Sequence, residues 1–239
     1  SAASDVYKRQ LYGYGQHTGI ETGDYAGAIG NPETFNDIGL DWTVGQVLQA
    51  AIGQSETSVT PLQMAGVAST IANRGVRYKT HLVDSIYDYS MENEIEKIEP
   101  EIAETIDINY DYVYDYVIDG MVQASENNFP ADYSLSNLGF DVAIKTGTPQ
   151  NWRNGGEVTD SCFIGFAPAD DPQIAFAGMI EGAEYSKYMI RSIIQAYYKH
   201  YSEDGDFSDV KINYLDNSSK NSENEDSAAT EPTNETDPA

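Results

Sequence analysis

The stretch Val142-Ala143-Ile144-Lys145-Thr146-Gly147-Thr148 joins a short apolar run to a Lys-Thr-Gly tripeptide. A tripeptide recurs by chance, so its place at the end of an apolar strand pattern is what makes it informative. Turn-forming Gly, Pro and Asp residues separate three strand patterns, at residues 140–147, 161–167 and 173–180. Because short connections join antiparallel neighbours, we expect these strands to form an antiparallel sheet.

Three helical patterns surround these strands. At Thr60-Pro61-Leu62-Gln63 a capping Thr precedes a first-turn Pro, and a Gln stands where a capping box needs it. An apolar face follows as far as Ala72, and Gly75 supplies the stop. A second pattern runs through Val113, Val117, Met121 and Val122. The third places Ile and Tyr at helical spacing from Ile190 to Tyr201, and we expect this helix to cover one sheet face.

Two segments carry weaker signals. Residues 11–40 are rich in Gly, which predicts loops and turns with little regular structure. Their Gly13-Tyr14-Gly15-Gln16-His17-Thr18-Gly19 stretch superficially resembles a dinucleotide-binding loop, but the spacing is one residue too long and no apolar strand precedes it. Residues 81–100 alternate around a polar break, which predicts two strands or an extended arm.

Composition excludes several classes of partner. The net charge is -26, with only 13 Lys and Arg, so we expect no nucleic acid, because phosphate backbones are bound mainly by cations. A single cysteine, Cys162, rules out an internal disulfide, and the three histidines lie too far apart for metal-ligand spacing. We therefore expect neither a metal nor a cofactor. No run of about 18 apolar residues is present.

The two ends differ from the middle. Residues 1–10 resemble the in-frame translation of a transposon-end adapter used in sequencing libraries, and we interpret them as an artefact. We interpret residues 11–207 as the C-terminal part of one domain, truncated near Leu11. Residues 208–239 turn to Asn, Ser, Glu, Asp and Thr, which predicts a disordered acidic tail.

Further motifs give the Lys-Thr-Gly strand a family context. Lys-Thr-Gly is one element of penicillin-binding proteins and β-lactamases, beside a Ser-x-x-Lys nucleophile motif and a Ser-x-Asn-type motif. From Leu11 to Tyr201 the chain resembles the C-terminal part of the transpeptidase domain of class B penicillin-binding proteins. The resemblance implies a peptidoglycan D,D-transpeptidase, which cross-links the cell wall by serine acyl transfer. The segments that carry this resemblance, in order, are Gly15–Ile20, Ala51–Gln54, Val59–Ala65, Ala72–Gly75, Phe163–Pro168 and Asp171-Pro172.

The resemblance implies a fold and a set of site residues. The fold would be the α/β (α+β) penicillin-recognition fold of serine transpeptidases and β-lactamases, an antiparallel sheet packed with helices. Lys145 would be catalytic, placing a positive charge beside the nucleophile and attracting the carboxylate of a D-Ala-D-Ala stem peptide. Thr146 would offer its hydroxyl to that carboxylate, Gly147 would let the substrate lie along the strand, and Thr148 would lend its backbone N–H to the oxyanion hole.

The chain departs from the family pattern in its nucleophile. The resemblance places Ser-x-x-Lys and Ser-x-Asn before Leu11, and neither occurs there. Ser208-Asp209-Val210-Lys211 fits the first pattern but lies in the polar tail, so we interpret it as chance. The second pattern is matched by Ser125-Glu126-Asn127, at a helix end, and by Ser222-Glu223-Asn224, in the tail. We interpret both matches as chance. Cys162 has no His in its local strand pattern, so we interpret it as a structural thiol.

The remaining implications concern partners and location. The resemblance implies peptidoglycan stem peptides and β-lactam antibiotics as ligands, and cell-wall elongation or division proteins as candidate partners. It implies work on the extracytoplasmic face of the bacterial membrane, with an anchor upstream. A β-lactamase, a penicillin-sensing receptor domain and a non-catalytic scaffold piece stay open as alternatives. Trp152, after the Lys-Thr-Gly strand, could shape the substrate rim or be a packed surface residue.

Overall fold

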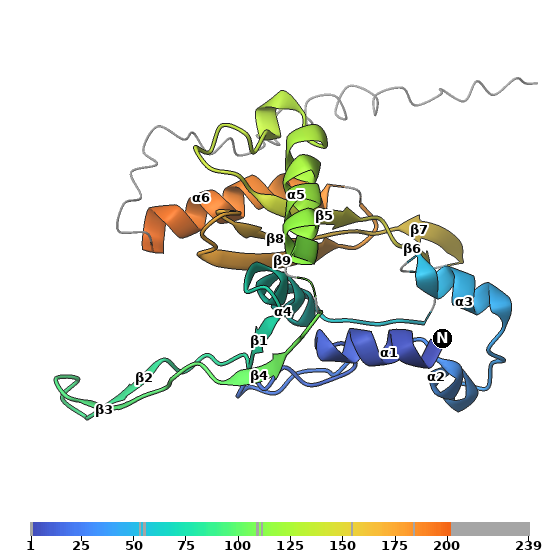
Figure 1. The fold of residues 1–239 in the computed structure, drawn as a ribbon, viewed down its shortest axis with the longest axis horizontal. Coiled ribbons are helices and arrows are strands. Elements are labelled where there is room, and N and C mark those ends of the chain that lie inside the picture. Colours follow the sequence, from blue (N-terminus) through green and yellow to red (C-terminus); the bar gives the residue numbers. More distant parts are fainter. Residues whose placement is uncertain are drawn as a thin grey trace, which may run out of the picture.

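The computed structural model describes residues 2–201, apart from residues 53, 55, 109, 111, 154 and 184. Helices cover both faces of a central sheet, and a long arm projects from one end (Figure 1). The helices and strands are α1 (Ala2–Leu11), α2 (Pro32–Asp37), α3 (Val44–Ala51), α4 (Pro61–Ala72), β1 (Val76–Tyr78), β2 (Ser85–Tyr87), β3 (Glu94–Lys97), β4 (Ile102–Thr105), α5 (Tyr112–Asn127), β5 (Ala143–Gly147), β6 (Gln150–Arg153), β7 (Gly156–Thr159), β8 (Ser161–Ala167), β9 (Ile174–Ile180) and α6 (Met189–Tyr201), with 3-10 turns at Ala131–Tyr133 and Ser186–Tyr188.

The three predicted strands form the central sheet, in the order β5-β8-β9 and with antiparallel pairing, as expected. Apolar side chains alternate between its two faces because successive strand residues point to opposite sides. Glycine at position 178 makes room for one of them, since a Cβ there would lie 2.4 Å from the Phe163 ring on the paired residue of β8. Both faces of the sheet therefore carry apolar side chains that helices can cover.

Helix α6 covers one face, as the sequence predicted. Ile190 and Ile194 are fully buried in a cluster with Ile144, Phe163 and Phe176 of the sheet. A second cluster on the other face joins Met121 of α5 to Ala143 and Phe166, with Ile71 and Ala72 of α4 packed against it. The predicted helices over residues 61–75 and 113–122 are α4 and α5, and both lie on this face (Figure 1).

The start and end of α4 follow its sequence. The Thr60 hydroxyl accepts the Gln63 N–H at 3.1 Å, and the Gln63 side-chain oxygen accepts the Thr60 N–H at 2.8 Å, which completes the capping box. After Ala72 the chain enters the left-handed region at Arg74 (φ 53°) and Gly75 (φ 100°). A Cβ on Gly75 would lie 2.6 Å from both the Ile106 carbonyl and the Tyr114 hydroxyl, so this turn needs glycine.

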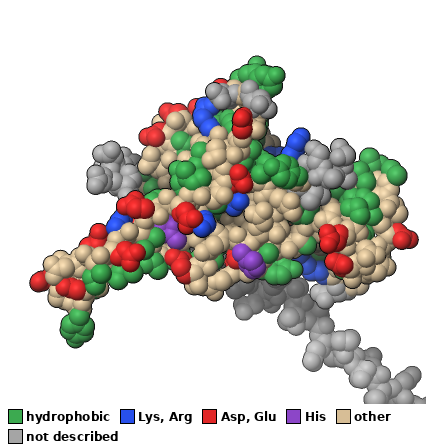
Figure 2. Space-filling view, turned by 60° about the horizontal axis from the view of Figure 1, so that its bottom comes forward, with side chains coloured by type: hydrophobic (Ala, Val, Ile, Leu, Met, Phe, Trp, Pro, Cys, Tyr) green, Lys and Arg blue, Asp and Glu red, His purple; other side chains and the backbone are tan. Residues whose placement is uncertain are grey.

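The predicted arm is a two-stranded hairpin of β2 and β3, which extends beyond the β1–β4 pair (Figure 1). Acidic side chains line it and apolar side chains gather at its tip (Figure 2). The tip includes Tyr89 and Met91, both exposed. Both sequence-based alternatives for residues 81–100, two strands and an extended arm, therefore hold.

Two local predictions were incomplete. Helix α2 lies within the segment predicted as loops, because the Asn31 side chain accepts the N–H groups of Glu33 and Thr34 and Pro32 opens the helix. The β6–β7 hairpin was not predicted. Residues 2–11 form α1, and the adapter interpretation of residues 1–10 remains a prediction. The predicted tail and its Ser208–Lys211 and Ser222–Asn224 patterns lie outside the described residues.

Candidate active site

The Lys-Thr-Gly strand β5 is an edge strand of the central sheet. Among the described strands it pairs only with β8, so one row of its backbone groups is open to an extended ligand. Buried Ile144 holds the strand in the core, whereas Lys145 just beyond it is exposed. The Lys145 ammonium donates to the Thr146 carbonyl, and Thr148 is exposed directly after the strand. The structure thus presents Lys145 to Thr148 in one run at an open edge.

The neighbouring strand leaves no room for a side chain at Gly147. It lies opposite Cys162 on β8, and a Cβ at position 147 would come within 2.8 Å of the Cys162 sulfur. Burial raises the pKa of the Cys162 thiol, an effect that the nearby Lys145 charge only partly offsets. A raised pKa disfavours the thiolate, so the geometry fits the structural role expected for this cysteine.

The β6–β7 hairpin continues the β5–β8 ladder in the same register. Gly147 lies opposite Cys162 and Gln150 lies opposite Thr159, so Thr148 and Pro149 between them face Ser161 and Asp160. Trp152 on β6 is 72% exposed, which excludes the packed alternative for its side chain. The indole therefore stands on the surface of the ribbon that extends the Lys-Thr-Gly strand.

Sequence reasoning missed Asp160, which is fully buried at the point where the two ladders join. Its carboxylate accepts hydrogen bonds from both terminal nitrogens of Arg153, from the Asn151 amide and from the Gly182 N–H. The Gly182 N–H, with help from Arg153 and Asn151, holds the pKa of Asp160 below its ordinary value in spite of burial. Its backbone N–H donates to the Pro149 carbonyl at 2.9 Å. The only sequence signal was an acid directly before a buried strand.

The glycine-rich segment that contains the Gly15–Ile20 turn is held by one side chain of helix α4 and by one side chain of strand β1. Buried Gln63 donates to the carbonyl oxygens of Gln16 and Ala26, each at 2.7 Å. The Arg77 guanidinium donates to the Leu11 carbonyl at 3.0 Å. Burial raises the pKa of Tyr14, directly before this turn, although the Arg9 charge partly offsets the effect. These contacts fix the turn against α4 and β1.

The Ser125–Asn127 pattern, possible metal ligands and possible membrane spans can also be examined in the described residues. Ser125 is buried in α5 and its hydroxyl donates to the Val122 carbonyl at 2.8 Å, so the Ser125–Asn127 pattern forms no site. Within the part of the chain that the structure describes, no group of three His, Cys, Asp or Glu residues could hold a metal ion. The described helices include none that is both long and apolar enough to cross a membrane.

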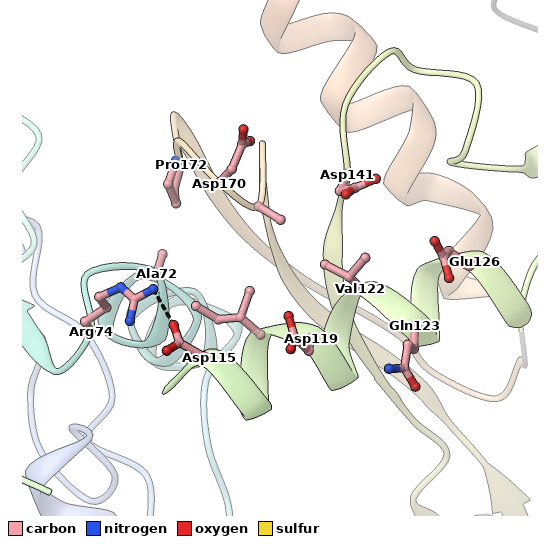
Figure 3. A pocket seen from close by; sticks show the side chains of 12 residues that line it. Ala72, Arg74, Asp115, Asp119, Val122, Gln123, Glu126, Asp141, Asp170 and Pro172 are labelled. Carbon is pink, nitrogen blue, oxygen red and sulfur yellow. Dashed lines mark hydrogen bonds and ion pairs between the residues drawn. The ribbon is translucent and has the colours of Figure 1, made fainter. Parts of the chain in front are cut away.

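A hollow of about 410 Å³ lies at the opposite end of β5 from the Lys-Thr-Gly residues, between α5 and the β8–β9 turn (Figure 3). Its floor is apolar, with Ile118 and Val122, and carboxylates dominate its rim. Arg74 pairs there with Asp115 at 2.6 Å. Asp141, before the strand, lines this hollow, whereas Thr148 follows the strand, so the hollow is separate from the Lys-Thr-Gly end.

Comparison with known proteins decides the family. A model of the penicillin binding protein transpeptidase domain matches residues 4–198. The chain belongs to this family. Its relatives include penicillin-binding protein 2A of Bacillus subtilis, 28% identical over 193 residues, which is 75% of this chain and 25% of that protein. Another is the peptidoglycan D,D-transpeptidase PbpA of Mycolicibacterium smegmatis, 30% identical over 58% of this chain and 28% of that protein.

Solved structures of penicillin-binding transpeptidases share the fold. Penicillin-binding protein 2B of Streptococcus pneumoniae aligns with a TM-score of 0.69 at 24% identity, over 82% of this chain and 32% of that chain. Penicillin-binding protein A of M. tuberculosis, solved as an imipenem acyl-enzyme complex, aligns with a TM-score of 0.63 at 23% identity, over 78% and 40%. The chain spans about a quarter of the length of the curated relatives it matches.

Proposed function

We propose that the protein carrying this chain is a peptidoglycan D,D-transpeptidase. A serine would attack the D-Ala-D-Ala end of one stem peptide, D-Ala would leave, and an amine of a neighbouring stem peptide would take the acyl group. One observation carries the proposal: the strand with Lys145, Thr146 and Gly147 lies at the open edge of a sheet in a transpeptidase family domain. An open edge of this kind can take an extended peptide as an additional strand.

Each residue of the strand has a proposed task. Lys145 supplies positive charge beside the nucleophile and toward the substrate carboxylate, and it is exposed for this role. Thr146 binds the carboxylate through its hydroxyl, and Gly147 keeps the edge flat for the substrate. Thr148 gives its backbone N–H to the oxyanion hole, where loss of one donor typically costs about 3 kcal/mol of transition-state stabilisation.

We propose that the nucleophilic serine comes from a part of the protein that this chain does not contain. The described residues hold no Ser-x-x-Lys sequence, and the chain spans only 25% of penicillin-binding protein 2A. As a direct test, the chain alone, incubated with a fluorescent penicillin, should give no covalent band on a denaturing gel. A band that disappears when the protein is boiled first would contradict this assignment.

Location and partners follow from the same proposal. Peptidoglycan lies outside the cytoplasmic membrane, so the protein would work on that face, held by an upstream anchor. Stem peptides and β-lactams would be its ligands, and elongation or division proteins are candidate partners.

The test of the function uses the full-length protein and a fluorescent penicillin. We expect a covalent adduct that forms within minutes and releases slowly, and that Lys145→Ala abolishes. Lys97→Ala is the matched control, because Lys97 is an exposed lysine paired with Asp84 on the β2–β3 arm. Rapid release of the penicillin would instead identify a β-lactamase, and slow release without cross-linking of stem peptides would identify a penicillin-sensing receptor.

A further inference from the structure

We propose that Asp160 and Arg153 are positioning residues for the transpeptidase site, which hold the Thr148–Pro149 segment so that the Thr148 N–H points toward the reacting carbonyl. This inference rests on the proposed function. It adds an ion pair with a buried carboxylate to a site that otherwise consists of the Lys-Thr-Gly strand and a serine. Neither residue touches the substrate in this proposal, since both act through the backbone.

The need for such a pair follows from the way the ribbon is built. The β6–β7 pair keeps the register of the β5–β8 pair, but strand β5 ends at Gly147 and strand β6 begins only at Gln150. Pro149 lies in the gap and has no N–H, so it cannot donate to the facing strand. The segment that carries the oxyanion donor is therefore the weakest part of the ribbon in backbone hydrogen bonding.

Asp160 compensates at this position with both its backbone and its side chain. Its N–H donates to the Pro149 carbonyl at 2.9 Å, which fixes the Pro149–Gln150 peptide, and the rigid Pro149 ring links that peptide to Thr148. Its carboxylate accepts from Arg153 Nη1 at 3.0 Å and Nη2 at 2.5 Å, in a bidentate arrangement, and also from the Asn151 amide. Residues 149, 151 and 153 are alternate residues of one strand, so their side chains point to the same face of the ribbon. Asp160 lies opposite Pro149 and points to that face too, which lets its carboxylate reach Asn151 and Arg153 of β6.

A third contact ties this joint to the rest of the sheet. The Gly182 N–H, in the turn after β9, donates to the Asp160 carboxylate at 2.7 Å. Asp160 is completely buried, whereas Arg153 is one-third exposed and also lies 3.4 Å from the exposed carboxylate of Glu181. The orientation of the hairpin therefore depends on one buried charge that three segments share. A carboxylate with this set of donors is rigid, as a preorganised oxyanion donor requires.

The experiment measures acylation of the full-length protein by a fluorescent penicillin in a stopped-flow instrument. Asp160→Asn keeps an acceptor for Gly182 but removes the charge that holds Arg153, and Arg153→Gln removes the other partner. We expect each to lower the acylation rate constant by about tenfold or more, with the dissociation constant of the non-covalent complex changed by less than about twofold. Arg153→Lys should recover part of the rate. Glu181→Gln, which alters only the exposed contact, should leave both constants unchanged.

A second readout separates this inference from the proposed function. Hydrogen exchange in the peptide that contains Thr148 should become about tenfold faster in Asp160→Asn than in the wild type, whether or not penicillin reacts. If the wild type does not acylate but exchange responds, the function is wrong and the positioning role stands. An unchanged acylation rate constant and unchanged exchange in a folded Asp160→Asn protein would overturn the inference. Should that variant not fold, the same criteria apply to Arg153→Gln and Arg153→Lys.

Discussion

Replacement of Gln63 by Glu is expected to damage the fold more than replacement by Ala. Both variants act on a side chain that is only 4% exposed and that joins helix α4 to the glycine-rich turn. Its amide nitrogen donates to the carbonyls of Gln16 and Ala26, each at 2.7 Å, while its oxygen caps the helix at Thr60. The buried side chain thus bonds backbone groups of three segments at once.

The expected magnitudes follow from these contacts. Gln63→Ala removes the donor from two partly buried hydrogen bonds. A fully buried loss costs about 1–3 kcal/mol, or about 2–6 kcal/mol for two, and because Gln16 is exposed to water we expect the lower part of this range, about 2–4 kcal/mol. Gln63→Glu keeps the shape and the cap but replaces the donor with a negative charge that faces the same two carbonyls. At neutral pH we expect it to cost at least about 1 kcal/mol more than the Ala variant.

Urea unfolding of the full-length protein, followed between pH 4 and pH 7, provides the measurement. The pKa of Glu at position 63 would be raised in the folded state, so its penalty should be complete above that raised pKa and should shrink as the pH falls toward about 4. Gln49→Glu is the control, because Gln49 is exposed on α3 and should shift stability by less than about 0.5 kcal/mol. Equal stability of the Gln63→Glu and wild-type proteins at pH 7 would refute the reasoning.

Three further predictions concern the site and its supports. Gly147→Ala should destabilise by about 1–3 kcal/mol in urea unfolding, and adding Cys162→Ala should recover at least about 0.5 kcal/mol of the loss, since the clash partner is gone. Additive losses would contradict this contact. Thr60→Ala should cost about 1 kcal/mol in the same assay, through the lost cap of α4. Because the pKa of Asp160 is lowered, the stability that its charge adds should be complete above about pH 5 and be lost as the pH falls below about 4. A urea series from pH 6 to pH 3 should therefore show a shallower acid loss in Asp160→Asn.

Much of the framework was predictable because its signals are local. The Thr60–Gln63 capping box lies within four consecutive residues, and the helical spacing from Ile190 onward predicted both α6 and its buried face. The Lys-Thr-Gly strand and its two neighbours each alternate or run apolar between turn residues, so their antiparallel pairing could be inferred. Periodicity and capping act within one element, which is why they can be recognised without a structure.

The parts that were missed depend on partners far apart in the sequence. Asp160 gains its role from Gly182 and Arg153, and nothing in its neighbours indicates that its carboxylate is buried. The same holds for Gln63, whose cap was predicted but whose two bonds to the glycine-rich turn were not. Helix α2 was missed for a different reason, because the Gly content around it outweighed a good local cap at Asn31.

The central claim is that the edge of β5 forms one wall of a penicillin-binding active site. Its most direct test is a crystal structure of the full-length protein after reaction with a penicillin. We predict a drug covalently bound to a serine, lying along β5, with its carboxylate at the Thr146 hydroxyl and Lys145 and its carbonyl oxygen at the Thr148 N–H. An adduct on any other surface, such as the hollow beside α5, or no adduct at all, would contradict the account.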